Sequence, residues 1–574
     1  MPPRYSIVIR GGTIADGNGG EPYIGDIAIT DGVIAAVGKF DGQGAREIDA
    51  QNRLVTPGFV DVHTHYDGQV TWSNRVTPSS WNGVTTVMMG NCGVGFAPCR
   101  PEQRDMLVHL MEGVEDIPEI VLNKGLPWNW QSFPDFLDAL DARRYDMDIA
   151  TQLPHAALRV FVMGQRGADR EPANAEDRAE MARLATEAIR AGAFGFSTSR
   201  TLNHRAVDGT PTPTVTAAEE ELTAIAEGMD KAGSGWIQLI SDFNDVDAEF
   251  DMFRRLVQRS HRPLSLLLLQ KDKRPNGWRD LLDKITTAND QGLPISAQVS
   301  TRATGTMVGL ELSRSLISGR PSYEAVAHLP LEQRVAELRR PEVKARILAE
   351  ESNDNWLQLL DVFDWTKLYP LGDPPDYEPK PEDSVAARAK REGRDPAEYA
   401  YDLQLERGGH AILYRPASNY AEGNLAAVRD MLQHPHTVVG LGDGGAHVGF
   451  LCDASVVSFM LTHWTRDRRH GTPFPIGWAV QRITRDPAVA IGLMDRGVIA
   501  PGYKADINVI DYDSMRLHPP EVAYDLPAGG RRVVQRTDGF VETLVSGVTV
   551  ARNGEATGDL PGRLIRGPQR SPAA

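Results

Sequence analysis

Short apolar segments alternate with amphipathic segments from residue 57 to about residue 500 of this chain. The apolar segments that read as strands are 84–89, 148–152, 195–197, 236–240, 264–269, 295–299, 411–413 and 438–441. Residues 172–191 and 217–232 have the spacing of helices between such strands. This alternation predicts an α/β fold, a (β/α)8 TIM-like barrel over residues 57–500, with active residues at the carboxyl ends of its strands.

The two ends of the chain have a different pattern. Residues 1–56 read as short strands, interrupted at Gly11-Gly12 and joined at Asp31-Gly32, a dipeptide that suits a type I′ hairpin turn. Residues 501–560 return to short strands, with a turn at Ser546-Gly547. Because a small sheet unit cannot bury much core alone, we expect one β-sandwich built from both ends. A tail over 561–574 follows it.

Residues 310–405 interrupt the alternation within the barrel. They contain several charged helical segments and a proline-rich stretch at 370–381. We interpret them as an insertion over the barrel mouth, either a lid or an oligomer contact, and we expect a homo-oligomer. A solvated surface excursion is the alternative interpretation.

Charge and cysteine content exclude several classes of protein. The 61 Lys and Arg residues against 77 Asp and Glu residues give a net charge of −16, which opposes binding to nucleic acid and to anionic membranes. Three cysteines, Cys92, Cys99 and Cys452, are too few for a disulfide scaffold. No apolar run reaches the length of about 18 residues that a membrane span needs, and the N-terminus lacks the apolar core of a signal peptide. We expect a cytoplasmic protein that acts on a small molecule.

The segment Pro-Gly-Phe-Val-Asp-Val-His-Thr-His, residues 57–65, places His63 and His65 at the end of an apolar strand. Because side chains on a strand alternate between its two faces, both imidazoles point to the same face. Two such imidazoles at the carboxyl end of a barrel strand can chelate one transition metal, usually zinc. The alternative is a pair of histidines that only satisfy hydrogen bonds near a strand end. The β-rich segment and the Pro-Gly turn before the strand favour a metal site.

An aspartate follows the last predicted barrel strand. Asp443 comes directly after residues 438–441, in the segment Leu-Gly-Asp-Gly-Gly-Ala-His. A carboxylate there can bind the metal and accept a proton from a water that the metal activates. Gly444 and Gly445 allow the backbone to come close to a ligand. The alternative is an ordinary Asp-Gly turn, but the position at the end of the last strand favours catalysis.

Cys92 follows the predicted second barrel strand, 84–89, in the segment Met-Gly-Asn-Cys-Gly. As a thiolate it is a candidate for a further metal ligand or for a bridge between two metals. A small buried hydrophobic residue is the more common role of a free cysteine, and the position alone leaves that alternative open.

Together these segments resemble the amidohydrolase superfamily, and within it the N-acyl-D-amino-acid deacylases, or D-aminoacylases. The similarity covers nearly the whole chain. It rests on GGTIADG at 11–17, the segment 57–65, GNCG at 90–93, GAFGFSTS at 192–199, the acidic helix start at 219–221, LGDGGAHVG at 441–449 and the segment 495–506 that leads back to the small sheet domain.

The resemblance implies a TIM-like barrel with a β-sandwich, bound zinc and hydrolysis of an amide. It implies that His63 and His65 are metal ligands and that Cys92 is a ligating or bridging thiolate. It also implies that Asp443 is both a metal ligand and the general base.

The chain departs from the deacylase pattern at two strands. These deacylases usually present one histidine at the end of the fourth strand and one at the end of the fifth, but the matching segments 236–241 and 264–270 contain none. We therefore expect Zn2+ in a site for one or two divalent ions, with one ion favoured over two. Its simplest ligand set is His63, His65 and Asp443, with Cys92 as a further ligand.

Three further residues are candidates for substrate binding. His155 and His204 follow predicted strands, where either could donate to a carbonyl oxygen or an oxyanion, and a structural or surface role is the alternative for each. An N-acyl amino acid also carries a carboxylate, which calls for a cation. Lys271 lies just past a predicted strand, and Arg159 and Arg200 are alternatives for that role.

The residues support three hypotheses. The first is a metal-dependent hydrolase that cleaves the amide bond of an N-acyl-D-amino acid or a similar amide, with a metal-activated water and Asp443 as general base. The second is a hydrolase of a lactone, a cyclic amide or a xenobiotic amide. The third is a non-catalytic binding protein on a decayed barrel, which the joint presence of His63, His65 and Asp443 disfavours.

Overall fold

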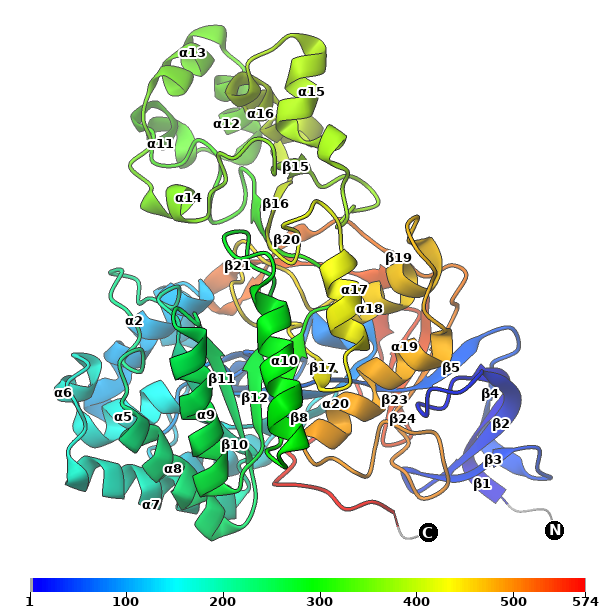
Figure 1. Ribbon diagram of the computed structural model, residues 1–574. Coiled ribbons are helices and arrows are strands. Elements are labelled where there is room, and N and C mark those ends of the chain that lie inside the picture. Colours follow the sequence, from blue (N-terminus) through cyan, green and yellow to red (C-terminus); the bar gives the residue numbers. More distant parts are fainter. Residues whose placement is uncertain (1–3, 573–574) are drawn as a thin grey trace.

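The computed structural model describes residues 4–572 and shows an α/β fold with two parallel sheets at its centre (Figure 1). Within those residues the larger sheet has six strands and the smaller sheet has three. The order of the larger sheet is β17 (Thr437–Val439), β13 (Ile295–Val299), β12 (Leu264–Leu267), β11 (Trp236–Ser241), β10 (Gly195–Arg200) and β9 (Leu153–Pro154). The order of the smaller sheet is β6 (Phe59–Asp61), β7 (Val84–Met89) and β8 (Asp148–Thr151).

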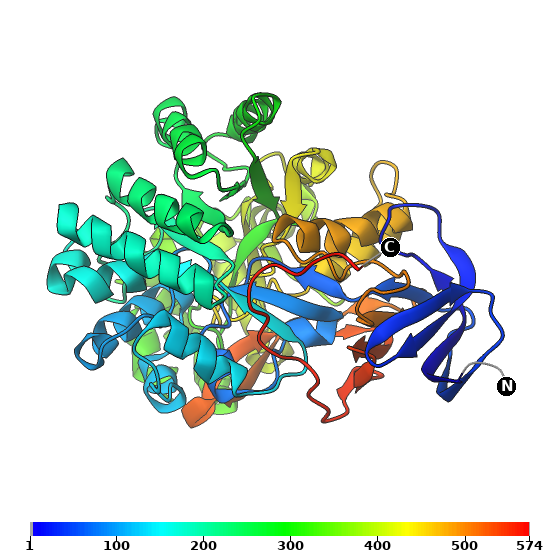
Figure 2. The ribbon, with the colours of Figure 1, turned by 90° about the horizontal axis from the view of Figure 1, so that it is seen from below.

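Helices cover the outer face of the larger sheet (Figure 2). The helices that connect its successive strands are α7 (Ala175–Ala191), α8 (Glu219–Ala232), α9 (Val246–Ser260) and α10 (Gly277–Asp290). The first two correspond to the helices predicted from the sequence. With helices on one side and core on the other, these strands are buried almost throughout, as parallel strands are in α/β proteins. In the described part of the chain, no helix combines the length and the apolar character that crossing a membrane needs.

The two parallel sheets are connected at both edges. β8 and β9 follow each other with one residue between them, so a single segment pairs with β7 on one side and with β10 on the other. At the opposite edges, the N–H of Asp443 donates to the carbonyl of His63 at 3.0 Å, and the N–H of His65 donates to the carbonyl of Gly444 at 2.8 Å. These bonds lie just beyond β6 and β17 and hold the carboxyl ends of the two edge strands together.

Strands from both chain ends combine in one mixed sheet, which has nine strands within residues 4–572. The strands are β1 (Arg4–Ile14), β2 (Tyr23–Thr30), β3 (Val33–Gly38), β4 (Gln43–Asp49), β5 (Leu54–Pro57), β18 (Ile507–Ile510), β23 (Phe540–Val545), β24 (Val548–Arg552) and β25 (Glu555–Ala556). Asp31 and Gly32 have φ values of 52° and 78°, as the predicted type I′ turn requires. The predicted interruption at Gly11-Gly12 is wrong, because β1 continues through a bulge at which Gly11 takes a φ of 63°.

Residues 304–418 form a unit that stands apart from the sheets (Figure 1). Its strands β14 (Thr304–Val308), β16 (Leu413–Ser418) and β15 (Tyr369–Pro370) are antiparallel. Its helices are α11 (Pro321–Ala327), α12 (Leu331–Leu338), α13 (Pro341–Ala349), α14 (Asn355–Leu359), α15 (Val385–Glu392) and α16 (Pro396–Gln404). The barrel strand predicted at 411–413 is wrong, since Leu413 packs with Val308 and Leu368 in a core of this unit.

The C-terminal segment packs against the parallel strands. Gly562 pairs with Tyr145, and Leu564 pairs with Ile149 of β8. The side chains of Leu564 and Ile565 are buried. Figure 2 shows this segment crossing the underside of the molecule, so the predicted tail is part of the packed fold.

Candidate metal centre

Four side chains from three strand ends meet in one cluster. His63 and His65 follow β6, Cys92 follows β7 and Asp443 follows β17. Nε2 of His63 lies 3.3 Å from Sγ of Cys92 and 3.6 Å from Oδ1 of Asp443. Nε2 of His65 lies 3.9 Å from the same oxygen of Asp443. The structure therefore brings together all four residues that the sequence analysis named as candidate metal ligands.

Two of these residues have left-handed backbone conformations. Cys92 has a φ of 54° and Asp443 a φ of 44°, values that are uncommon for residues with a side chain. Oδ1 of Asp61 accepts the N–H of His63 at 3.0 Å. A Cβ atom at Gly442 would lie 1.9 Å from Oδ2 of Asp61. Glycine at 442 is thus what allows the chain to pass close to Asp61 and place Asp443 beside His63.

The two glycines after Asp443 lie where this segment passes close to the segment that follows β6. A Cβ atom at Gly444 would lie 2.3 Å from Oη of Tyr66, and one at Gly445 would lie 2.6 Å from the carbonyl oxygen of His65. In the structure these glycines let the backbone pass close to the segment that carries the two histidines. The predicted approach of this backbone to a ligand stays a prediction.

Three buried polar residues that the sequence analysis missed contact the cluster. Oε1 of Gln298 accepts a hydrogen bond from Nδ1–H of His63 at 2.6 Å. Oε1 of Gln238 accepts the backbone N–H of Cys92 at 2.8 Å. Oε1 of Glu115 lies 3.1 Å from Nδ1 of His65.

A sequence signal exists for each of the missed residues. Glu115 is the last residue of α2 (Arg104–Glu115) and lies four and eight positions after the buried Met111 and Leu107, on the apolar face of that helix. An acid on an apolar face needs a partner. Gln238 and Gln298 are buried amides within the mostly apolar strands β11 and β13.

Burial controls the protonation of the cluster. Burial lowers the pKa of His63 to about 4, so its imidazole is neutral at pH 7 and keeps a lone pair. Burial, and then the charges of Asp453 and Asp61, raise the pKa of Asp443 well above its ordinary value. Burial, and then the charge of Asp443, raise the pKa of the Cys92 thiol. A bound cation favours the ionised forms of both groups and so offsets this cost.

The donor set fits a divalent metal ion. Imidazole nitrogen, thiolate sulfur and carboxylate oxygen are the ligand atoms that zinc takes in proteins. One such atom from each of His63, His65 and Cys92 lies within 4.8 Å of the others. Oδ1 of Asp443, which faces both histidines, is buried and has no hydrogen-bond partner in residues 4–572.

His155 belongs to a different buried network. Its Nδ1 lies 2.8 Å from Oγ1 of Thr198, and its Nε2 lies 2.8 Å from Oε1 of Glu221. Arg159 donates to the other oxygen of Glu221. Because both ring nitrogens of His155 are engaged, this geometry does not support the predicted contact between His155 and a substrate. Arg159 is paired with Glu221, so this geometry does not support its alternative role as the cation for a substrate carboxylate.

We expect Glu221→Gln to lower the free energy of unfolding at pH 7 by about 3–5 kcal/mol, because the buried guanidinium of Arg159 loses its counter-charge. Burial alone would raise the pKa of Glu221, but His155 and Arg159 outweigh it and hold that pKa at about 2. The folded state therefore binds its proton less readily than the unfolded state, and the stabilisation disappears as the pH falls from about 4.5 to about 2. Urea unfolding at several pH values, with the exposed neighbour Glu220→Gln as control, tests this. Equal stability of both variants at pH 7 would contradict it.

His204 lies beside the metal cluster. Its Nδ1 is 3.0 Å from Oγ of Ser199. Burial, and then the charges of His447 and His63, lower its pKa to about 3. A neutral imidazole at this place can donate one hydrogen bond, so the predicted substrate contact of His204 stays a prediction.

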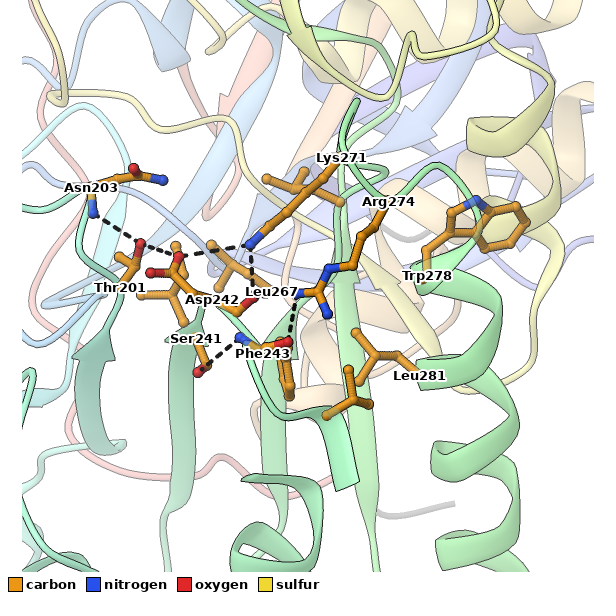
Figure 3. A pocket seen from close by; sticks show the side chains of 14 residues that line it. Thr201, Asn203, Ser241, Asp242, Phe243, Leu267, Lys271, Arg274, Trp278 and Leu281 are labelled. Carbon is orange, nitrogen blue, oxygen red and sulfur yellow. Dashed lines mark hydrogen bonds and ion pairs between the residues drawn. The ribbon is translucent and has the colours of Figure 1, made fainter. Parts of the chain in front are cut away.

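A recess opens where β11 and β12 end (Figure 3). Its apolar lining comes from Ile240, Phe243, Leu267, Leu269, Trp278 and Leu281. Lys271 and Arg274 reach over it from the loop after β12. Nζ of Lys271 donates to the backbone carbonyl of Asp242 at 3.1 Å and lies 3.7 Å from the Asp242 carboxylate. Apolar walls beside two cations suit an apolar group that is linked to a carboxylate.

Comparison with known proteins adds independent evidence. The family model described as "Amidohydrolase family" matches residues 46–551 of the chain. An uncharacterized protein of Mycobacterium tuberculosis (strain ATCC 25618 / H37Rv) is 27% identical, over 96% of this chain and 93% of that protein. N-acyl-D-aspartate deacylase of Alcaligenes xylosoxydans xylosoxydans is 26% identical, over 89% of this chain and 86% of the deacylase. The solved structure of N-acyl-D-glutamate deacylase from Bordetella bronchiseptica, complexed with zinc and a phosphonate inhibitor, has a TM-score of 0.64 at 22% identity, with 98% of this chain and 100% of that chain covered.

Proposed function

The chain belongs to the amidohydrolase family, and on that premise we propose that it hydrolyses the amide bond of an N-acyl-D-amino acid. It is a metal-dependent hydrolase that acts on carbon–nitrogen bonds. The observation that carries the proposal is the cluster of His63, His65, Cys92 and Asp443 at the ends of three parallel strands. The deacylase from Alcaligenes, which acts on N-acyl-D-aspartate, supports the substrate class.

We infer that the two parallel sheets form one closed barrel. With β8 and β9 counted as one strand, the six strands of one sheet and the three of the other give eight. The hydrogen bonds between the segments after β6 and β17 support closure at the remaining edge. Closure would place all four candidate ligands at the carboxyl end of the barrel, where active sites of this architecture lie.

We infer that His63, His65, Cys92 and Asp443 hold one zinc ion. The deacylase from Bordetella, whose structure contains zinc, supports the choice of metal. β11 ends in Ile240 and Ser241, and β12 ends at Leu267, so neither strand ends in a histidine. Toward their carboxyl ends these two strands present amide, hydroxyl and alkyl side chains. Such groups are poor zinc ligands, which favours one ion over two.

Asp443 carries the proton in the proposed reaction. With all four side chains bound, a water would have to be a fifth ligand; the metal would lower its pKa and polarise the scissile carbonyl. Asp443 accepts one proton from that water while the water oxygen forms a bond to the carbonyl carbon. Asp443 then delivers the proton to the amide nitrogen as the carbon–nitrogen bond breaks. The products are a carboxylic acid and an amine, and the carboxylate of Asp443 is regenerated.

The recess beside β11 and β12 is the proposed place for the bound substrate (Figure 3). Its leucines would contact the apolar part of the substrate, and Lys271 would pair with the carboxylate. His204 follows Asn203, which lines the recess, and the charge of His63 is among those that lower its pKa, so we propose His204 as the donor to a substrate oxygen. Nζ of Lys271 already contacts Asp242, so the substrate carboxylate would compete with Asp242 for this ammonium group.

A substrate panel tests the proposal. The purified protein is assayed against N-acyl-D-amino acids, their L-enantiomers, lactones, cyclic amides and aryl amides, with and without added zinc. We expect hydrolysis of one or more N-acyl-D-amino acids, and loss of that activity after chelation. Activity confined to lactones or cyclic amides would favour the second hypothesis from the sequence. A metal-free chain with no hydrolysis of any compound would favour a binding protein.

Replacement of Lys271 is expected to weaken substrate binding more than it slows the reaction. Lys271→Met keeps most of the apolar part of the side chain and removes its charged end, so KM should rise about 10–100-fold, the equivalent of one hydrogen bond to a charged group. Steady-state kinetics on the best substrate of the panel measures this, and the exposed neighbour Lys273→Met is the control. An unchanged KM would remove Lys271 from the binding site.

A further inference from the structure

We propose that three buried side chains, each beside one metal ligand, are positioning residues for the centre. They are Gln298, Glu115 and Gln238. Each comes from a different element, β13, α2 and β11, and each presents an oxygen atom to the ligand residue that it contacts. The inference rests on the proposed metal-dependent function. It goes beyond that function by identifying the residues that orient the metal-ligand side chains.

Gln298 sets the tautomer of His63. An amide oxygen can only accept a hydrogen bond, so the proton of the neutral imidazole sits on Nδ1, 2.6 Å from Oε1 of Gln298. The lone pair is then on Nε2, the nitrogen that lies 3.3 Å from Sγ of Cys92 and 3.6 Å from Oδ1 of Asp443. Because Gln298 is fully buried, no bulk water competes for this bond.

Glu115 lies beside Nδ1 of His65, as Gln298 lies beside Nδ1 of His63. Its Oε1 lies 3.1 Å from Nδ1 of His65, and the other ring nitrogen faces Asp443. Apart from this approach, neither carboxylate oxygen of Glu115 has a hydrogen-bond partner in the part of the chain that the structure describes. A buried acid that has no Lys or Arg partner among the described residues is retained at a cost in stability, which indicates a role at the centre. A carboxylate behind a metal-bound histidine orients the ring and increases its basicity.

Gln238 acts on the backbone of Cys92. Its Oε1 accepts the Cys92 N–H at 2.8 Å, and the side chain is fully buried. Cys92 has a φ of 54°, a left-handed conformation that is unfavourable for a residue with a side chain. This hydrogen bond, from a strand of the other parallel sheet, favours the turn that directs Sγ toward His63.

A purely structural role would be to satisfy buried polar groups of the core, and it predicts no effect on metal binding. The experiment therefore measures metal affinity directly. Wild type, Gln298→Leu, Gln298→Asn and Gln298→Glu are compared by zinc competition with a chromophoric chelator. Gln298→Asn keeps the amide but shortens the reach by one methylene, and Gln298→Glu keeps an oxygen acceptor at full length.

The matched control is Gln404→Leu. Gln404 is a buried glutamine of α16 whose Oε1 accepts the N–H of Leu316 at 2.9 Å, within the 304–418 unit. Thermal melting of each variant reports on folding. If Gln298→Leu does not fold, Gln298→Asn decides the question.

We expect the Leu and Asn variants of Gln298 to bind zinc about 10–100-fold more weakly than wild type, and Gln298→Glu and Gln404→Leu to bind it as wild type does. Glu115→Leu should weaken binding to a similar extent. In Co2+-substituted protein, Gln238→Leu should lose intensity in the thiolate-to-metal charge-transfer band. Wild-type zinc affinity in both Gln298→Leu and Gln298→Asn would overturn the positioning role alone. Absence of zinc binding by wild type would overturn the proposed function as well.

Discussion

Asp443→Asn is expected to lower kcat by about 10²–10⁴-fold, the usual contribution of a positioned general base. The asparagine side chain has nearly the same shape as aspartate, so it fits beside His63 and His65, but it cannot accept the proton of the attacking water. In protein shown to hold the same amount of zinc as wild type, the loss should appear in kcat and in kcat/KM alike, because proton acceptance occurs only as the reaction proceeds. Steady-state kinetics on the best N-acyl-D-amino acid measures it.

The control for this variant is Asp559→Asn, which changes an exposed aspartate near the C-terminus. It removes one negative charge far from the cluster and should leave kcat unchanged. If Asp443→Asn kept the kcat of wild type, Asp443 would have no part in proton transfer, and the proposed mechanism would be wrong.

The second large effect is expected from the histidines. The double variant His63→Ala and His65→Ala removes two of the proposed ligands, and zinc content should fall from about one ion per chain to a small fraction of that value, together with all hydrolytic activity. Both side chains are buried, so the variant must be shown to melt cooperatively. Elemental analysis after dialysis measures the metal content.

An exposed histidine provides the control. His261, at the end of α9, is largely exposed, and His261→Ala should keep both zinc and activity. Zinc retained in the double variant at the level of wild type would mean that the ion binds elsewhere in the chain.

The sequence was most informative where a strand ends in a functional side chain. His63 and His65 could be located because alternation along a strand places both rings on one face. Asp443 could be located because a short apolar segment directly precedes it. These inferences depend only on local periodicity, and the distances of 3.6 and 3.9 Å between the histidines and Asp443 agree with them.

Contacts between distant elements were harder to predict. Glu115 reaches His65 from a helix fifty residues later, and nothing in the local pattern specifies which ligand a buried acid faces. In the sequence, Gln238 and Gln298 are identifiable only as amides within mostly apolar strands. Their partners, Cys92 and His63, follow other strands. Their roles depend on the relative placement of strands, which a single sequence does not determine.

The strand predicted at 411–413 failed for a related reason. A short apolar segment is compatible with any buried strand, parallel or antiparallel. Leu413 packs in the core of the 304–418 unit, in an antiparallel strand rather than in a parallel sheet. Length and hydrophobicity could indicate that this segment is buried, but they could not indicate which core buries it.

The most direct test of the central claim is a diffraction experiment at the zinc absorption edge on crystals of the purified protein. The claim predicts one anomalous peak per chain, bonded at about 2.0–2.3 Å to Nε2 of His63, Nε2 of His65, Oδ1 of Asp443 and Sγ of Cys92. A zinc-replete crystal with no peak among these four atoms, or with its only peak at another site, would contradict it.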